Sequence, residues 1–204
     1  MINHPNNAIY LASKSPRRSE LLQQIGVKFG ILLLRDSASR GNDVTELVLP
    51  NEHPVDYVAR VTAEKAHIGW QMMRKRSLPE RPILAADTTV VFNGCIYGKP
   101  ADQDQALEML STLSGQTHQV LTSVALCYQD QVWQVTQTSE VTFCRLSVAQ
   151  IADYCASTEP YDKAGGYGIQ GDAARFISHI NGSYSGIMGL PLFETAQLLS
   201  KVGL

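Results

Sequence analysis

The chain has 204 residues, of which 44% are hydrophobic and 18% are charged, and its formal net charge is -2. A chain of this length can bury one sizeable core, and its near-neutral charge argues against a nucleic-acid polymer as the main partner, because nucleic-acid-binding surfaces are usually strongly basic. No stretch is apolar enough to span a bilayer and residues 1–7 lack the features of a signal peptide, so we expect one domain over residues 1–204, located in the cytoplasm, without a membrane partner.

A short apolar strand near the start of the chain leads into a predicted helix that begins at Pro16. Ser15 is a good N-cap and proline a good first helical residue, because proline lacks the N–H that would have no partner there. The free N–H groups of the first turn and the guanidinium groups of Arg17 and Arg18 would surround one small volume. We interpret this turn as an anion site that would take a phosphate; a solvated basic turn is the alternative.

The next segment begins with the apolar residues 31–34, which predict a strand, and turns polar over 35–43, which predicts a surface excursion. Pro54 then opens a helix whose inward residues are spaced by three and four. One of them is Lys65, which either extends to the surface or needs an anionic partner. The predicted inward residues are Val58, Val61, Thr62, Lys65, Ile68 and Met72.

A continuous apolar and β-branched run over residues 83–92 predicts a central strand. Asp87 interrupts this run. Carboxylates are rarely buried unless they are paired or bind a metal. Asp87 is therefore the best candidate for chemistry in this sequence, and an aspartate at a strand end facing water is the alternative.

Asn93-Gly94 predicts a two-residue hairpin turn, after which residues 95–100 return alongside the central strand. If Phe92 and Cys95 flank the turn, Asp87 and Lys99 share one end of the hairpin. Strict alternation would place their side chains on opposite faces, so the two can meet only where strand pairing ends or bulges near Pro100. We expect such a break.

The second half of the chain predicts helices and a second hairpin. Asp102 with Gln105 and Ser147 with Gln150 resemble capping boxes, for helices that end near residues 113 and 156. Two long strands are expected at 117–128 and 132–143, a further strand at 175–180, and a last helix from Pro191 to Gly203. This order of elements predicts a mixed α/β fold, a sheet flanked by helices.

The four cysteines are scattered and form no C-x-x-C pair. Each stands beside apolar residues, which is typical of small buried side chains and not of zinc ligands or disulfides. They are Cys95, Cys127, Cys144 and Cys155.

A glycine-rich loop at 159–171 contains a G-x-G-x-x-G pattern. The pattern follows a polar loop and not a strand, precedes no clear amphipathic helix and has no acidic residue at the expected distance, so its context argues against a dinucleotide site. The glycines would let the backbone approach a ligand closely, with Lys163 supplying a charge and Gln170 an amide that both donates and accepts hydrogen bonds. A tight structural loop is the alternative.

Eight motifs follow one another along nearly the whole chain. They are Leu11-Ala12-Ser13-x-Ser15-Pro16-Arg17-Arg18, Asp43-x-x-Glu46, Glu64-Lys65-Ala66, Ala86-Asp87-Thr88, Gly98-Lys99-Pro100, Leu113-Ser114-Gly115-x-x-His118, Asp162-Lys163-Ala164-Gly165-x-Tyr167-Gly168-Ile169-Gln170-Gly171 and Gly189-Leu190-Pro191. This set resembles the Maf family of nucleoside triphosphate pyrophosphatases. The resemblance implies a twisted mixed sheet like that of the inosine triphosphate pyrophosphatases, bilobed with a central cleft, and often a homodimer. It also implies hydrolysis of a nucleoside triphosphate to the monophosphate and pyrophosphate with a divalent metal, Mg²⁺ or Mn²⁺.

Carried over residue by residue, the resemblance makes Asp87 the catalytic proton acceptor, with Lys65 and Lys99 beside it. Glu46 and Asp87 would bind the metal. The segment between Phe29 and Asp43 is longer than is usual in the family. The residues that would bind the substrate are Ser13, Ser15, Arg17, Arg18, Thr88, Lys163 and Gln170.

The branch of the family that this chain resembles acts on dTTP and UTP, and its specificity positions correspond to Arg18, Thr88 and Gln170. The expected function is therefore a house-cleaning pyrophosphatase that hydrolyses these nucleotides and non-standard ones. Three alternatives are a nucleotide-binding regulator without turnover, a 7-methyl-GTP pyrophosphatase and a dinucleotide-dependent oxidoreductase.

Overall fold

A mixed sheet forms the centre of the computed structural model, which describes residues 8–34 and 44–204. Within these residues the sheet has seven strands in the order β2-β1-β3-β5-β6-β7, and β4 pairs with β3. β1 pairs in parallel with β2 and β3, whereas the other pairs are antiparallel. The strands are β1 Ala8–Leu11, β2 Lys28–Ile31, β3 Ile83–Phe92, β4 Cys95–Tyr97, β5 Thr117–Tyr128, β6 Gln131–Phe143 and β7 Ile177–Asn181.

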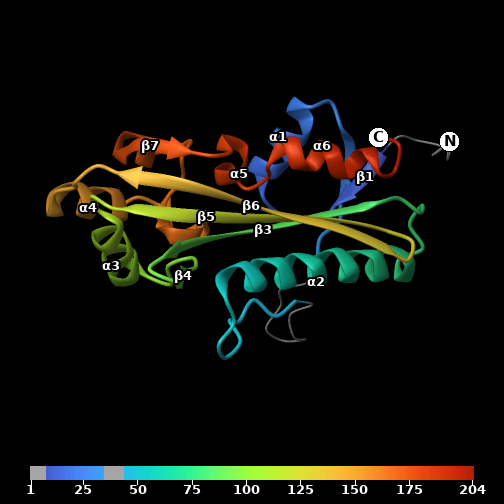
Figure 1. Cartoon of the computed structure of the whole chain (residues 1–204), viewed down its shortest axis with the longest axis horizontal. Helices are drawn as coiled ribbons and strands as arrows, with labels where there is room; N and C mark the ends of the chain where they lie inside the picture. Colours follow the sequence, from blue (N-terminus) through green and yellow to red (C-terminus); the bar gives the residue numbers. More distant parts are fainter. Residues whose placement is uncertain (1–7, 35–43) are drawn as a thin grey trace.

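Helices cover both faces of this sheet. Figure 1 shows α2 along one face of the sheet and α1, α5 and α6 over the other face, with α3 and α4 at the left-hand end of the sheet. The helices are α1 Pro16–Gln24, α2 Pro54–Lys75, α3 Gln103–Leu113, α4 Val148–Cys155, α5 Tyr184–Met188 and α6 Leu192–Ser200, and short 3₁₀ turns lie at Pro160–Asp162, Ala164–Gly166 and Asp172–Phe176. The predicted mixed α/β fold is confirmed.

Apart from Asp87 and the two threonines that follow it, β3 is apolar, because both of its faces are covered. Ile83 and Ala85 pack in a cluster with residues of α2, whereas Leu84 and Ala86 pack with residues of α1 and α6 on the other face. Alternating side chains of a strand point to opposite faces, so a strand covered on both sides is expected to be mainly apolar. Asp87 is therefore an exception that the packing does not explain.

One edge of β3 is open in its middle. β1 pairs with it at Ile83 and Leu84, and β4 pairs with it from Val90 onward, where Val90 lies opposite Tyr97. In the part of the chain that the structure describes, residues 85–89 between these two pairings contact a strand only on their other side, β5. The expected break in pairing before Lys99 is confirmed, and it leaves a gap in the sheet beside Asp87.

Two strand predictions are wrong. The strand predicted at 31–34 is β2, Lys28–Ile31, because its register is set by β1, where Leu11 pairs with Ile31; Leu33 is half-exposed. The strand predicted from residue 175 begins at Ile177, because a 3₁₀ turn occupies Asp172–Phe176. The polar stretch at 35–43, with Asp43 of the second motif, lies outside the described residues.

Two further local predictions need correction, and one helix was not predicted. Asp102 caps α3 by accepting from the Gln105 N–H at 2.9 Å, but the Gln105 side chain accepts from Ala101, so the predicted capping box does not form. Cys95 and Cys144 are exposed and not buried, since each lies at the end of a strand and not within it. α5 was not predicted, because five residues are too few to carry a helical period.

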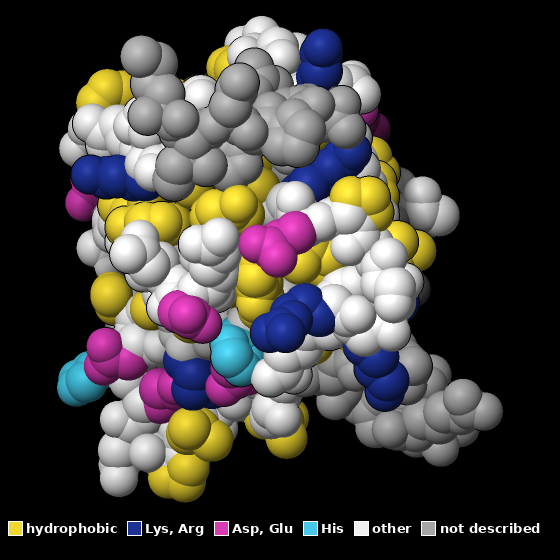
Figure 2. Space-filling view, turned by 90° about the vertical axis from the view of Figure 1, so that its right-hand side faces the viewer, with side chains coloured by type: hydrophobic (Ala, Val, Ile, Leu, Met, Phe, Trp, Pro, Cys, Tyr) yellow, Lys and Arg dark blue, Asp and Glu magenta, His cyan; other side chains and the backbone are white. Residues whose placement is uncertain are grey.

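The surface carries charges of both signs. Figure 2 shows the end of the molecule at the right of Figure 1, where basic, acidic and hydrophobic side chains are interspersed and neither sign dominates. None of the described helices is long and apolar enough to cross a membrane.

Candidate functional site

A cleft of about 640 Å³ opens beside the gap in the sheet. Its volume lies within the range of small-molecule sites, roughly 300 to 1,000 Å³. Every site residue predicted from the sequence lines it, although their chemical roles stay predictions. These residues are Ser13, Ser15, Arg17, Arg18, Glu46, Lys65, Asp87, Thr88, Lys99, Lys163 and Gln170.

Lys65 joins the two predicted metal ligands. Its Nζ lies 2.6 Å from Glu46 Oε1 and 2.6 Å from Asp87 Oδ1. The Lys65 and Asp87 side chains are each 15% exposed, whereas Glu46 is 54% exposed. The anionic partner that a lysine on the inward face of α2 requires is therefore present, and Lys65 does not extend into solvent.

Glu46 and Asp87 fit the metal that the family resemblance implies. Both carboxylates already contact one cation, the Lys65 ammonium. Carboxylate oxygens are the ligands that Mg²⁺ and Mn²⁺ prefer. No third acidic, histidine or cysteine side chain joins them among residues 8–34 and 44–204, so substrate phosphates and water would supply the other ligands, as is usual for Mg²⁺.

The first turn of α1 forms one wall of the cleft. Ser15 caps the helix, with its Oγ 3.5 Å from the Arg18 N–H, and Ser13 Oγ accepts from the Ser15 N–H at 3.1 Å. The Arg18 guanidinium donates to Ser13, to the Gly189 carbonyl at 2.8 Å and to Thr88 Oγ1 at 3.3 Å. Burial lowers the pKa of Arg18, and the Asp87 carboxylate opposes this effect. Arg18 thus connects α1, β3 and the end of α5.

Arg17 does not share the partners of Arg18 but forms an ion pair with Asp162. Its Nη1 lies 3.4 Å from Asp162 Oδ2, and Lys163 Nζ lies 2.5 Å from Asp162 Oδ1. Desolvation opposes the change, but contacts with Lys163 and Arg17 lower the pKa of Asp162. The two arginines therefore border the same cleft but are held by different groups, and they do not converge on one point as the sequence suggested.

Lys99 follows β4 and is exposed at the cleft. Among the residues that the structure describes, no acidic side chain forms an ion pair with it. A lysine of this kind can bind a phosphate without first breaking an ion pair, unlike Lys65.

The glycine-rich loop forms another wall of the cleft. Gly165 has φ +69°, and a Cβ there would come within 2.8 Å of Val90 Cγ2, so a larger residue would not fit. Gln170 is exposed at the cleft. Glu159 supports the loop, because its carboxylate accepts from the Tyr154 hydroxyl at 3.0 Å and the Asp172 N–H at 2.9 Å.

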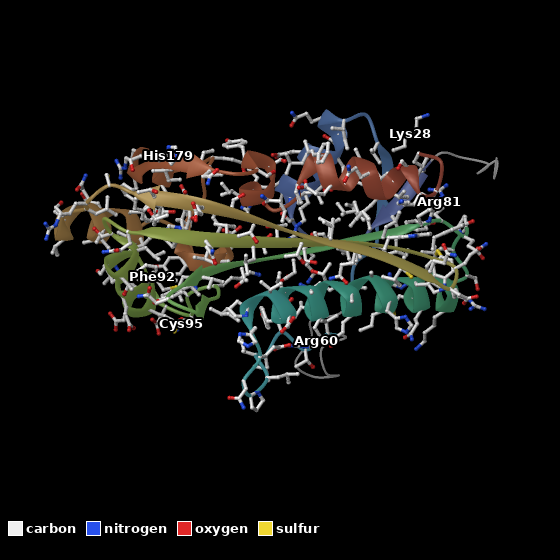
Figure 3. All side chains as sticks on the ribbon, viewed as in Figure 1. Lys28, Arg60, Arg81, Phe92, Cys95 and His179 are labelled. Atoms are coloured by element: carbon white, nitrogen blue, oxygen red, sulfur yellow. The ribbon has the colours of Figure 1, made fainter. Side chains whose placement is uncertain are left out.

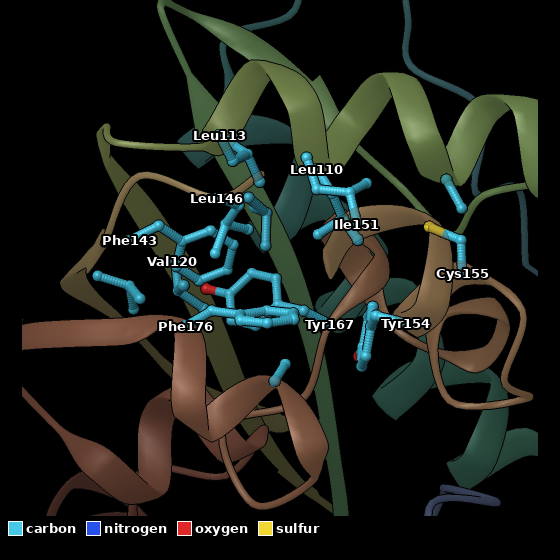
Figure 4. Packing of buried hydrophobic residues seen from close by; sticks show 14 residues of the cluster. Leu110, Leu113, Val120, Phe143, Leu146, Ile151, Tyr154, Cys155, Tyr167 and Phe176 are labelled. Carbon is cyan, nitrogen blue, oxygen red and sulfur yellow. The ribbon is translucent and has the colours of Figure 1, made fainter. Parts of the chain in front are cut away.

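Tyr167 anchors the same loop in the core. Its hydroxyl lies 2.7 Å from Nε2 of His118, and its ring packs edge-on against Phe143. Figure 4 shows Tyr167 among the buried side chains of one core cluster, which also contains Phe143 and Phe176. His118 is 2% exposed, and burial lowers its pKa to about 4. His118 is therefore neutral at pH 7.

Sequence reasoning missed Tyr57, which lines the cleft. Its hydroxyl donates to the Glu46 carbonyl at 3.1 Å, and burial, with the charges of Asp87 and Glu46, raises its pKa to about 12. The spacing could have identified it, because Tyr57, Val61 and Lys65 follow one another at intervals of four and share a helical face.

Comparison with known proteins places this geometry in a family. The model of the family described as Maf-like protein matches residues 8–202. A "dTTP/UTP pyrophosphatase" of Nitrosomonas europaea is 54% identical over 100% of this chain and 99% of its own, and one of Dechloromonas aromatica is 49% identical over 96% and 97%. The solved structure of the Staphylococcus aureus Ham1 protein is a distant likeness, with 14% identity and a TM-score of 0.40 over 67% of this chain and 71% of its own. The chain belongs to the Maf family.

Proposed function

We propose that the chain is a nucleoside triphosphate pyrophosphatase that hydrolyses dTTP and UTP to the monophosphate and pyrophosphate. The observation that carries this proposal is the meeting of Asp87, Glu46 and Lys65 in a cleft that basic side chains surround. The names of the relatives, which match over nearly their full length, support the same reaction.

The basic residues would bind the triphosphate. Arg17, Arg18 and Lys99 line the cleft, and the first turn of α1 presents backbone N–H groups at its positive end. Charge-assisted hydrogen bonds from these groups would neutralise the phosphates. Because the groups are fixed by the fold, most of the catalytic effect would come from orientation and electrostatics.

Glu46 and Asp87 would hold a divalent metal, Mg²⁺ or Mn²⁺. When bound, this metal would neutralise phosphate charge and help to orient water. Lys65 keeps the two carboxylates together, because their mutual repulsion would otherwise push them apart.

Asp87 would act as the general base. Its carboxylate would accept a proton from the water that is added across the anhydride bond between the α and β phosphates. The water oxygen would bond to the α phosphorus as the bond from that phosphorus to the bridging oxygen breaks, and pyrophosphate would leave with the electron pair on that oxygen. Lys65 and Lys99 would neutralise the charge that develops there.

Gln170, Thr88 and Arg18 would select the base. The Gln170 amide offers a donor and an acceptor in one plane, which matches the O4 and N3–H groups of uracil and thymine. Cytosine reverses both groups, and a site built on such hydrogen bonds rejects a base that leaves them unpaired. Purines would be poor because of their size.

A panel of triphosphates tests this function. Pyrophosphate release with Mg²⁺ or Mn²⁺ is expected to be fastest for dTTP and UTP and slow for CTP, ATP and GTP. Binding without release would favour the alternative of a nucleotide-binding regulator. If 7-methyl-GTP led the panel, the roles given to Arg18, Thr88 and Gln170 would be withdrawn, while that of Asp87 would remain.

A further inference from the structure

Four of the five N–H groups of the Arg60 guanidinium are bonded to the segment that carries Glu46. Figure 3 shows Arg60 on the side of α2 turned away from the sheet, beside the segment that precedes this helix. Its Nε and Nη2 donate to the two oxygens of Glu52 at 2.6 and 2.9 Å. Nη2 also donates to the Leu47 carbonyl at 3.0 Å, and Nη1 donates to the Thr45 carbonyl and to Glu64, both at 3.2 Å. A guanidinium has five N–H groups, so each one has an acceptor.

These bonds hold the backbone on both sides of Glu46. Arg60 binds the carbonyls of Thr45 and Leu47, and the Tyr57 hydroxyl binds the carbonyl of Glu46 itself. Three consecutive carbonyl groups are thus attached to α2, the helix that also carries Lys65. The Arg60 guanidinium lies 5.7 Å from the centre of the Tyr57 ring, so the two side chains support each other.

Apolar burial contributes little to the position of this segment. Val44 is buried, but Leu47 is 73% exposed and Val48 and Leu49 are about half exposed. The Glu52 carboxylate that binds Arg60 also accepts from the Leu49 N–H at 2.9 Å and closes the turn. Polar bonds centred on Arg60 therefore hold the backbone beside Glu46 where apolar burial holds it little.

We propose that Arg60 is a positioning residue for Glu46. It fixes the backbone of residues 45–47 so that the Glu46 carboxylate faces Asp87 and Lys65, without touching either substrate or metal. This inference rests on the proposed function only in that it takes Glu46 to be a ligand of a divalent metal.

The test is the Arg60→Lys variant, which keeps the charge but cannot bond in five directions. We expect the Mg²⁺ concentration for half-maximal turnover to rise roughly 10- to 100-fold, the usual effect of removing a group that orients a metal ligand, while the KM for UTP at saturating Mg²⁺ stays within about twofold. Hydrogen exchange of the Leu49 amide is expected to become faster at the same time. Tyr57→Phe, which removes one of the three carbonyl bonds, is expected to give a smaller shift in the same direction and carries the test if Arg60→Lys does not fold.

Arg74→Lys is the matched control, because Arg74 lies on the same helix and is exposed. Arg74→Lys is expected to change neither the Mg²⁺ concentration for half-maximal turnover nor the hydrogen exchange of the Leu49 amide. Unchanged Leu49 exchange in Arg60→Lys, or faster exchange with an unchanged Mg²⁺ requirement, would overturn the inference. A wild type that releases no pyrophosphate would overturn the proposed function instead, and the exchange measurement would still decide whether Arg60 holds the segment.

Discussion

The two walls of the cleft are built in different ways. The carboxylate wall, formed by Glu46, Lys65 and Asp87, is held by ion pairs between α2, β3 and the segment before α2. The glycine wall, formed by residues 163–171, is held by its backbone and by two supports, Glu159 and the His118–Tyr167 pair. The first wall carries the carboxylates and the second carries Gln170, so we expect chemistry to depend on the first and discrimination between uracil and cytosine to depend on Gln170 in the second.

The largest expected effect is on the carboxylate wall. Asp87→Asn keeps the size of the side chain but removes the proton acceptor, so kcat is expected to fall by roughly two to four orders of magnitude. Circular dichroism is expected to show a folded protein. Asp130→Asn, at the exposed turn between β5 and β6, serves as the control. Near-normal turnover in Asp87→Asn would exclude this residue as the base.

The next effect concerns a support of the glycine wall. His118 has a pKa of about 4 in the folded protein and about 6.5 when unfolded, so the unfolded chain binds more protons between these values. Stability due to this group is present above pH 6.5 and is lost as the pH falls toward 4, by on the order of 3 kcal/mol. Urea unfolding at pH 7 and pH 4 measures this loss.

His118→Phe is the control for that experiment, because it keeps a ring between Phe143 and Tyr167 but cannot titrate. Its free energy of unfolding is expected to depend less on pH than that of the wild type. Equal pH dependence in the two proteins would mean that His118 does not carry the effect.

Substitutions of the two lysines are expected to differ in their effects on substrate binding and on protein stability. Lys99→Ala removes a cation without an acidic partner among the described residues, so the KM is expected to rise through the loss of roughly 1.5 to 3 kcal/mol per charge-assisted hydrogen bond, with stability unchanged. Lys65→Ala leaves two carboxylates without their shared cation, so it is expected to lower the thermal unfolding temperature as well. If Lys99→Ala destabilised the protein and kept its kinetics, Lys99 would be structural.

The sequence predicted the carboxylate wall better than the supports around it. Asp87 was identifiable because a charge inside an apolar strand is costly, and Lys65 because it stands on an inward helical face. β3 has the predicted bounds, and the Ser147–Gln150 capping box forms, because both depend on neighbouring residues.

What the sequence did not reveal depends on contacts between distant residues. From the sequence, Arg60 resembles an ordinary helical charge paired with Glu64 at i,i+4. Its other acceptors, Glu52 and the carbonyls of Thr45 and Leu47, lie in the segment before α2, and no spacing rule connects them to it. The pair of His118 and Tyr167 joins β5 to a loop 49 residues later. β2 was misplaced for the same reason, because its register is set by β1 and not by its own apolar residues.

The division between the two walls is tested most directly by the ratio of kcat/KM for UTP to that for CTP. In Gln170→Leu the ratio is expected to fall by about tenfold, the effect of losing a net hydrogen bond to the base, while UTP turnover at saturation changes little. In Lys65→Ala, which alters the carboxylate wall, kcat/KM for both substrates is expected to fall by the same factor, so the ratio stays within about twofold of the wild type. A ratio that is unchanged in Gln170→Leu, or that collapses in Lys65→Ala, would contradict the account.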